Sequence, residues 1–407
     1  MKIIKAHKIR LNPTPEQEQY FWQAAGIARF AYNWGLAEYN KSKAAGEKIQ
    51  IVGKGDTLKS QFTALKQTIY PWLGEVSSYA YQGAFADLQK SVSNYFDRHK
   101  KGLLKPPSGW KSRKDSKPFG WPQFKSKYKD TPSFYQANTC LQFDGHWIKI
   151  QKCPGQVNMT EPLRFDGKVM GARISYYATH WWLSIYIEID HEVPIHNANV
   201  VGVDLGVKYL AVTSDGQIFE NPKPFISAQR KLARLQRSFA RMEKDGKNWL
   251  KMKAKIANLH FRVANLRNEA SHQMTTQLTR RYGIIGTENL NIRGMTQNRR
   301  LSKAINDAAF YEKRRQLEYK AAWSGGIIVP VDRWFPSSKL CNSCGEINAD
   351  LRLSDREWIC SNCGNLNHRD GNAALNIRDE TIRILTGPAT QGDSLNDPTL
   401  TSRGVVG

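Results

Sequence analysis

Four cysteines near the C-terminus restrict the fold more than any other feature of this chain. Cys341 and Cys344 form one C-x-x-C pair, and fifteen residues separate it from a second pair, Cys360 and Cys363. Each pair can present two thiolates from one tight turn, and two such turns complete the tetrahedral four-cysteine site of a zinc ribbon. The alternative, four unpaired cysteines, is disfavoured by this spacing. We therefore expect one structural Zn²⁺ on these four side chains, although such an ion alone indicates no function.

The charge of the chain indicates a polyanionic partner. Its 407 residues include 60 Lys and Arg against 36 Asp and Glu, which gives a formal net charge of +24. Lysine and arginine neutralise phosphates and release condensed counterions, so nucleic acid is the favoured partner. A solvated basic surface or an anionic membrane is the alternative. The length allows two or three domains with an ample core.

A cytoplasmic location is expected from the cysteines and from the lack of long apolar runs. Residues 1–5 lead directly into a charged, alternating stretch, so we expect no signal peptide. The sequence contains no run of eighteen apolar residues, so we expect no membrane partner. Six cysteines, four of them in ribbon spacing, fit a reducing cytosol better than a disulfide framework. The other two, Cys140 and Cys153, are interpreted as buried or incidental thiols.

Strand patterns in the N-terminal half predict a β-barrel-like module. Residues 2–11 alternate in polarity, as in a strand with one buried face. Two hairpins are expected from these pairs of β-rich runs: 140–143 with 146–150, on the turn Asp144-Gly145, and 169–177 with 181–189. The economical interpretation is one module over residues 131–195 that also includes strand 2–11.

A helical block with a basic extension separates these strands. Thr14 is the expected N-cap of a first helix, with Pro15 at its first position. Further helices are expected over residues 58–69 and 77–96. Residues 98–129 then combine many Lys and Arg with prolines and with the aromatics Trp110, Phe119, Trp121, Phe124 and Tyr128. Proline prevents a long helix here, and the mixture suits a nucleic-acid backbone with splayed bases. A disordered basic linker is the alternative.

The C-terminal half combines strands that end in acids with a basic helical hairpin. Apolar strands are expected at residues 200–204 and 284–288, and each ends in a carboxylate. Residues 225–282 keep helical periodicity with one apolar face and a free basic face, and Gly246 is the expected break. A helix is expected over 307–323, a strand over 326–331, and a last helix from Ala373. The polar tail 387–407 has no periodicity and is predicted to be disordered.

Asp204, Glu288 and Asp370 share one position, because each lies where a predicted strand ends or a helix begins. Individually, each has the ordinary interpretation of a turn acid or a helix cap. Together on an α/β sheet, they would converge and hold two Mg²⁺ ions about 4 Å apart. One ion would lower the pKa of an attacking water and the other would stabilise the leaving oxyanion, as phosphodiester hydrolysis requires. These hard oxygen ligands leave the thiolates to a different ion.

Four segments resemble the motifs of the TnpB family, the transposon-encoded RNA-guided nucleases related to type V CRISPR effectors. They are residues 202–207, 285–290, 335–341 and 369–377, with weaker matches at 29–34 and 122–127. The order strand–acid–Gly, strand hairpin, strand–Glu and helix-proximal Asp is also that of an RNase-H-like nuclease core. The resemblance runs from the first residues to about residue 380.

The resemblance implies an α+β multidomain architecture. As in the family, a wedge β-barrel would comprise residues 1–12 and 131–195. A helical recognition domain with a basic linker would be inserted over residues 13–130. A RuvC-like nuclease domain would comprise 196–335 and 364–386, interrupted by the zinc ribbon over 336–363 and followed by the disordered tail 387–407.

The resemblance also implies a function. The family's catalytic set of acids matches Asp204, Glu288 and Asp370, which would bind two catalytic Mg²⁺ ions. The protein would be an RNA-guided DNA endonuclease with a guide RNA from the transposon end and double-stranded target DNA. We expect a monomeric ribonucleoprotein in a prokaryotic cytoplasm, associated with the nucleoid. One site would cut both strands in succession and leave 5′-phosphate and 3′-hydroxyl ends.

Two further residues match a helix that touches a short DNA motif beside the target in the family. These are Tyr79 and Gln82, and an amide can pair with an adenine edge while an aromatic ring packs on a thymine methyl. Ordinary packing of Tyr79 in the helical block is the alternative. The chain departs from its relatives at His368, where they usually carry an acid, but this position adjoins the site and is not a required ligand.

Two other functions are compatible with parts of the sequence. A non-catalytic, guide-dependent DNA-binding repressor or transposition regulator would not need all three acids, which are intact here. A strand-transfer transposase would also be RNase-H-like, but the order Asp, Glu, ribbon, Asp differs from the usual Asp-Asp-Glu arrangement. The favoured hypothesis is the RNA-guided endonuclease, since no obvious helix-turn-helix is present and base pairing would supply specificity.

Overall fold

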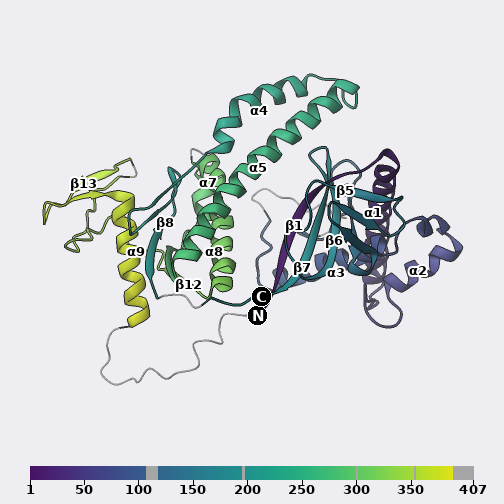
Figure 1. Cartoon of the computed structure of the whole chain (residues 1–407), viewed down its shortest axis with the longest axis horizontal. Helices are drawn as coiled ribbons and strands as arrows, with labels where there is room; N and C mark the ends of the chain where they lie inside the picture. The colour runs from purple at the N-terminus through teal and green to yellow at the C-terminus, as the bar shows by residue number, and fades with distance from the viewer. Residues whose placement is uncertain (107–117, 195–197, 299–300, 353, 388–407) are drawn as a thin grey trace. The chain divides into compact units, whose positions relative to one another are not determined.

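The computed structural model describes residues 1–106, 118–194, 198–298, 301–352 and 354–387. The chain divides into two compact units, residues 1–191 and 192–407. Each unit combines a β-sheet with helices, so the fold is a mixture of α and β structure (Figure 1). Of the helices in the described residues, none has the length and apolar character needed to cross a membrane.

The first unit is built on one seven-stranded antiparallel sheet. Its strands are β1 (Lys2–Asn12), β2 (Ser133–Ala137), β3 (Leu141–Asp144), β4 (Trp147–Ile150), β5 (Gln156–Met159), β6 (Lys168–Tyr177) and β7 (His180–Asp190). They lie in the order β2-β6-β7-β1-β5-β4-β3. β1 pairs with β7 along almost its whole length, from Lys2 opposite Asp190 to Leu11 opposite Trp181. The first strand of the chain is thereby joined to strands that follow the helices.

The face of β1 that is buried agrees with its sequence pattern. Ile3, His7, Ile9 and Leu11 are buried, whereas Ile4 on the opposite face is exposed. Successive side chains of a strand point to opposite faces, so a period of two in polarity becomes a period of two in burial. The prediction of a strand over residues 2–11 is confirmed.

Helices of the first unit pack on this sheet and on one another. They are α1 (Pro15–Ala44), α2 (Leu58–Thr68), α3 (Tyr79–Lys100) and the 3-10 turns η1 (Pro71–Glu75) and η2 (Asn138–Cys140). Thr14 caps α1 as expected: its hydroxyl accepts from the Gln17 N–H, and the Gln17 side chain accepts from the Thr14 N–H. The core between helices and sheet includes Phe21, Phe85 and Trp181.

The first predicted hairpin is displaced by one residue. Asp144 pairs with Trp147, so the two-residue turn is Gly145-His146 and not Asp144-Gly145. Gly145 has a φ of 51°, which a residue without a Cβ adopts at no steric cost. The second hairpin, between β6 and β7, lies where the sequence predicted it.

Trp121 does not offer a free stacking surface, contrary to the sequence-based expectation. Its side chain is buried, its indole N–H donates to Asn40, and its ring centroid lies 4.8 Å from that of Tyr95. Trp121 therefore anchors the extended segment to α1 and α3. Phe124 and Tyr128 remain exposed, and Trp110 lies outside the described residues.

The second unit contains a five-stranded mixed sheet. Its strands are β8 (Val200–Asp204), β9 (Tyr209–Thr213), β10 (Ile218–Glu220), β11 (Ile284–Glu288) and β12 (Ile327–Val331), in the order β10-β9-β8-β11-β12. β8, β11 and β12 are parallel, whereas β9 is antiparallel to both of its neighbours. The carboxyl ends of β8 and β11 therefore meet at one edge of the sheet.

The helices of this unit are α4 (Pro224–Ala240), α5 (Lys247–Arg281), α6 (Ile292–Gln297), α7 (Ser302–Ala308), α8 (Phe310–Ser324) and α9 (Arg369–Thr386). α4 and α5 form the expected helical hairpin, visible in Figure 1, and Gly246 is the N-cap of α5. Ala309, at a φ of 50°, separates α7 from α8 where one helix was expected. The tail 388–407 lies outside the described residues.

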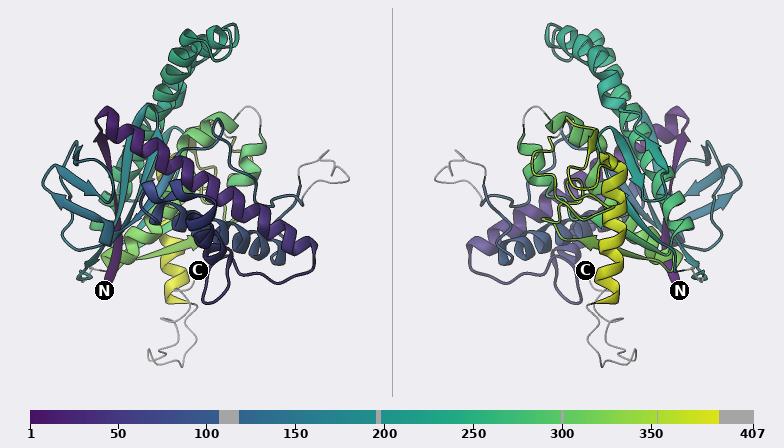
Figure 2. Two further views of the ribbon diagram at one scale, coloured as in Figure 1. Left: turned by 90° about the vertical axis from the view of Figure 1, so that its right-hand side faces the viewer. Right: turned by 90° about the vertical axis from the view of Figure 1, so that its left-hand side faces the viewer.

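The last helix begins earlier than its apolar pattern predicted. α9 starts at Arg369 rather than at Ala373, so Asp370 lies in its first turn. The partial positive charge of a helix N-terminus favours an acid at this position. Figure 2 shows α9 in yellow, with the loops that carry the cysteines beside its N-terminal half. A short antiparallel pair, β13 (Glu357–Ile359) and β14 (Leu366–His368), precedes the helix.

Candidate functional site

Two of the three predicted acids lie side by side because their strands are adjacent. β8 and β11 are parallel neighbours with Thr287 opposite Val203. The next residues, Asp204 and Glu288, therefore leave the sheet together at its carboxyl edge. In open α/β sheets this edge is where ligands bind.

The third acid is brought to the same edge by close packing of α9 on the sheet. A Cβ on Gly202 of β8 would collide with backbone atoms of Ala374 and Arg378, and a Cβ on Gly286 of β11 would collide with the Thr381 hydroxyl. These two glycines let the helix lie directly on both strands. The first turn of α9 then places Asp370 close enough for its charge to act on Asp204.

The electrostatics of this carboxylate site are suited to binding a cation. Burial raises the pKa of Asp204 well above its usual range, and the nearby charges of Glu288 and Asp370 raise it further. Arg369 and Lys313 act in the opposite direction but do not cancel these effects. Like charges held together in a partly dry environment are stabilised by protons or by bound metal ions. The residues present therefore fit a divalent cation with a preference for oxygen ligands.

Lys313 is a component of the site that sequence reasoning missed. It lies on α8 with its side chain completely buried, and its Nζ donates to the carbonyl of Leu210 at 2.9 Å. Burial lowers the pKa of Lys313 to about 7, although the charge of Asp204 acts to raise it. Its position in the sequence could have indicated that it is buried, because Lys313 shares a helical face with the buried residues Phe310 and Leu317.

Two contacts connect the carboxylate site to the cysteine segment. The Ser337 hydroxyl donates a hydrogen bond to Oε1 of Glu288. Arg356, between the two cysteine pairs, places Nη1 3.4 Å from Oδ1 of Asp370. The segment from Ser337 to Arg356 therefore touches two of the three acids.

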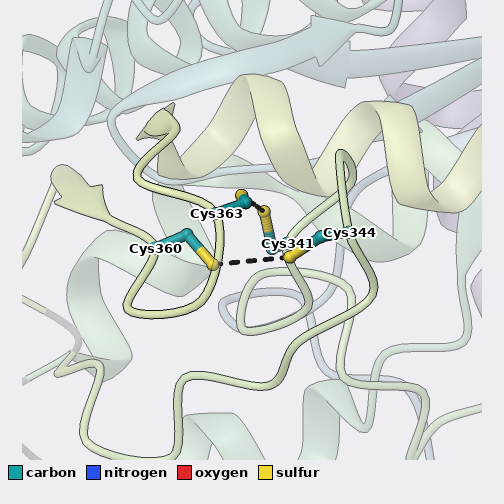
Figure 3. A group of neighbouring side chains, drawn as sticks. All are labelled: Cys341, Cys344, Cys360 and Cys363. Atoms are coloured by element: carbon teal, nitrogen blue, oxygen red, sulfur yellow. Dashed lines mark hydrogen bonds between the residues drawn. The ribbon is translucent and has the colours of Figure 1, made fainter.

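The four predicted zinc ligands form one compact cluster. The Sγ atoms of Cys341, Cys344, Cys360 and Cys363 all lie within 4.8 Å of one another. Dashed lines in Figure 3 mark two of the pairs, Cys344 with Cys360 at 3.5 Å and Cys341 with Cys363 at 3.7 Å. Zn–S bonds of about 2.3 Å in a tetrahedron give edges of about 3.8 Å. The arrangement therefore fits a tetrahedral thiolate-bound ion, whereas a disulfide requires about 2 Å.

Local hydrogen bonds lower the pKa of one of these thiols and so favour its metal-binding form. Burial acts to raise the pKa of Cys341, but backbone N–H groups of Ser343 and Cys344 and the Asn367 side chain lower it to about 6. The Asn367 amide lies 3.6 Å from the Cys341 sulfur. The thiolate form, which binds metal, is thereby favoured at neutral pH.

The carboxylate site is less compact than this four-cysteine cluster. Among the described residues, the four cysteines are the one group of three or more His, Cys, Asp or Glu side chains placed closely enough to hold a metal ion together. The three carboxylates repel one another, and a site for two ions about 4 Å apart spreads its ligands around both. The wider spacing is compatible with two ions.

Tyr79 and Gln82 lie one turn apart at the start of α3 in the first unit. Both are half-buried, and the Gln82 amide donates to the Ser78 hydroxyl at 3.3 Å. Their contact with a DNA motif stays a prediction. Cys140 and Cys153 are buried, as expected for thiols without a surface role.

The hairpin of α4 and α5 carries a basic surface in the second unit. Arg230, Arg234 and Arg237 line one open groove along α4, at spacings that keep them on one face. All three are exposed, and none forms an ion pair within the part of the chain that the structure describes. At the tip, the rings of Phe239 and Trp249 stack with centroids 4.9 Å apart. Such a surface suits a row of phosphates.

Known relatives cover almost the whole chain. A protein of Streptomyces pristinaespiralis named "Putative RNA-guided DNA endonuclease" is 30% identical over 379 residues, which are 92% of this chain and 89% of the relative. The chain belongs to the TnpB family. A second member, "Putative RNA-guided DNA endonuclease InsQ" of Escherichia coli strain K12, is 30% identical over 393 residues, with 93% and 92% coverage.

Family models match three parts of this TnpB chain. The "Probable transposase" model covers residues 184–299, with Asp204 and Glu288, and the "Cas12f1-like, TNB domain" model covers 310–377, with the four cysteines and Asp370. A "Helix-turn-helix domain" model covers residues 1–48. The structure has one strand and one uninterrupted helix there, β1 and α1, and no pair of helices joined by a turn.

A solved structure shares the fold of the chain. The Cas12f1 protein in the cryo-EM structure of its complex with sgRNA and target DNA aligns with a TM-score of 0.52. The alignment covers 93% of this chain and 99% of that chain at 15% identity. At this identity the likeness concerns the fold.

Proposed function

We propose that this TnpB protein is an RNA-guided DNA endonuclease that cuts a guide-matched target beside a short adjacent motif. The observation that carries the proposal is the convergence of Asp204, Glu288 and Asp370 at one sheet edge, where their charges and burial raise the pKa of Asp204. A binding protein without catalysis has no need of three mutually repelling acids. The printed names of the two bacterial relatives support the same activity.

The three acids would hold two Mg²⁺ ions, as their hard oxygen donors suit this metal. The bound ions would activate a water for attack on the phosphodiester and stabilise the leaving oxyanion. Ser337 donates a hydrogen bond to Glu288, and the protonated form of the buried Lys313 would act electrostatically to lower the pKa of Asp204. The cysteine cluster would hold one Zn²⁺ with a structural role.

The nucleic acid would be held mainly by its backbone. The exposed arginines on α4 provide positive charge for the phosphates. Sequence specificity would come from pairing between guide RNA and target DNA. Tyr79 and Gln82 are proposed to contact the adjacent motif. We propose a monomeric ribonucleoprotein.

The domain assignment is part of the same proposal. The sheet order β10-β9-β8-β11-β12 with an antiparallel β9 supports an RNase-H-like nuclease domain over residues 196–335 and 364–386. Residues 336–363 would be its zinc ribbon. The antiparallel sheet and helices of the first unit support a wedge domain with an inserted recognition domain.

The first test is to purify the protein from cells that carry its native flanking DNA and to sequence the RNA that co-purifies. The proposal predicts one structured RNA with a fixed boundary and a variable guide end. This ribonucleoprotein should cut matched DNA when Mg²⁺ is present. Heterogeneous cellular RNA, or guided binding without any cleavage, would contradict the proposal and favour a regulator.

A further inference from the structure

Two asparagines of α9 hold the turn that precedes the first cysteine pair. The Asn376 side chain donates to the carbonyls of Ser337 and Leu340, both at 2.7 Å. The Asn372 side chain donates to the same Leu340 carbonyl at 2.6 Å. Both asparagines are almost fully buried, at 2% and 4% exposure. Because buried amides are costly to leave without partners, this turn is firmly attached to the helix.

The first cysteine pair is attached to the same two asparagines. Asn342, between Cys341 and Cys344, donates its backbone N–H to Oδ1 of Asn372 at 3.0 Å. Its side-chain amide donates to Oδ1 of Asn376 at 3.1 Å. The side-chain oxygens of the two asparagines thus accept hydrogen bonds from the cysteine pair, and their amide groups donate hydrogen bonds to the preceding turn.

The other end of this turn contacts the carboxylate site. Ser337 is buried at 4% exposure, and its hydroxyl donates to Oε1 of Glu288. A continuous hydrogen-bonded path therefore runs from the cysteine pair through Asn342 and Asn376 to Ser337 and Glu288.

We infer that Ser337 is a positioning residue for Glu288, and that the asparagine pair makes its position depend on the four-cysteine cluster. This inference rests on the proposed function, since it assigns Glu288 the role of a metal ligand. It adds a coupling between two sites: an intact cysteine cluster would be needed for full metal affinity at the acids.

The physical basis is the freedom of a glutamate side chain. A free glutamate has several rotamers, and binding a metal ion through one of them costs conformational entropy. The Ser337 hydroxyl occupies one lone pair of Oε1 and leaves the remaining acceptor sites of the carboxylate available. Residues that orient metal ligands typically change metal affinity by about 10- to 100-fold when they are removed.

The test measures Mn²⁺ binding to the full chain by electron paramagnetic resonance, with zinc content and thermal unfolding recorded for each variant. Ser337→Ala should weaken Mn²⁺ binding by about tenfold with unchanged zinc content. Ser337→Thr, which keeps the hydroxyl, should restore most of the affinity. The neighbouring Ser338→Ala is the matched control and should bind as the unaltered protein does.

A second variant perturbs the hydrogen-bonded path at its other end, next to the first cysteine pair. Asn342→Ala keeps all four cysteines but removes the side-chain contacts with Asn376 and Asp379, so it should weaken Mn²⁺ binding in the same direction by a smaller factor. This measurement keeps the inference testable if Ser337→Ala unfolds.

Each outcome bears on one of the two proposals. Unchanged Mn²⁺ affinity in a folded Ser337→Ala or Asn342→Ala variant would overturn the coupling. It would leave the nuclease proposal intact if Asp204→Ala still abolishes Mn²⁺ binding and cleavage. If Asp204→Ala binds Mn²⁺ and cuts DNA normally, the proposed site itself is wrong.

Discussion

The four-cysteine cluster and the carboxylate site are two candidate metal sites of one unit, and they are built in opposite ways. The cluster draws its ligands from two short turns within residues 341–363, and its sulfurs already lie at tetrahedral spacing. The carboxylate site draws Asp204, Glu288 and Asp370 from two strands and a helix that are far apart in sequence. Its geometry depends on the packing of α9 on the sheet.

This difference indicates a role in stability for the cysteine cluster and a role in the reaction for the carboxylate site. A closed four-thiolate site leaves no coordination position for a substrate, so its ion contributes folding energy. The acids lack such closure, and their mutual repulsion is released when a cation binds. We therefore expect loss of the first site to unfold a segment, and loss of the second to stop the reaction in a folded protein.

The sharpest test of this contrast is Asp204→Ala. We expect cleavage to fall by on the order of a thousandfold or more, because one of the three proposed metal ligands is lost. Binding of guide and target should persist, as the basic surface is unchanged. The measurement is cleavage of a matched DNA together with a binding assay. Asp350→Ala, at an exposed acid of the same unit, is the control and should cut normally.

Cys341→Ser tests the other half of the contrast. We expect loss of zinc and a lower unfolding temperature, because one of the four proposed thiolate ligands is removed. Atomic absorption and thermal unfolding would show both effects. Unchanged zinc content in the purified variant would refute the four-thiolate site.

Gly202→Ala tests whether helix packing creates the carboxylate site. Its Cβ would collide with the backbone of α9 at Ala374, so we expect destabilisation by roughly 1–3 kcal/mol together with weaker metal binding. Gly371→Ala is the matched control, since a Cβ there meets no atom within 4 Å. Chemical denaturation measures the free energy of unfolding of both variants. Equal values would show that α9 adjusts to the extra carbon.

The smallest expected effect is a pH dependence confined to the carboxylate site. Burial and the neighbouring acids raise the pKa of Asp204, so the folded protein without metal binds a proton more tightly than the unfolded chain does. Its stability should fall as pH rises from about 4 towards that raised pKa. Mg²⁺ must displace this proton, so Mg²⁺ affinity should increase up to about tenfold per pH unit in this range. Titration calorimetry at several pH values measures the Mg²⁺ affinity. Asp204→Asn has no carboxylate at this position, so in this variant the pH dependence of stability without metal should be lost.

Local patterns in the sequence were sufficient for elements whose cause is local. The Thr14 cap, the alternation of β1 and the break at Gly246 each depend on neighbouring residues, and the structure confirms them. The cysteine cluster belongs to the same class, because spacing alone brings two thiolates to each turn. The turn of the first hairpin was wrong by one residue, since register depends on the partner strand.

Tertiary packing decided the rest. The sequence around Trp121 predicts an extended basic chain. In the structure Trp121 is buried, because it packs against Tyr95 and bonds to Asn40. Lys313 is buried, bonds to the Leu210 carbonyl and acts electrostatically on Asp204. Ser337 bonds to Glu288. Both hydrogen bonds join elements that are distant in sequence. By itself the sequence determined which residues are the candidates for metal binding and catalysis, because side-chain type and local spacing are properties of short segments. Their mutual positions follow only from the packing of α8, α9 and the turn at Ser337 against the sheet, which no short segment encodes.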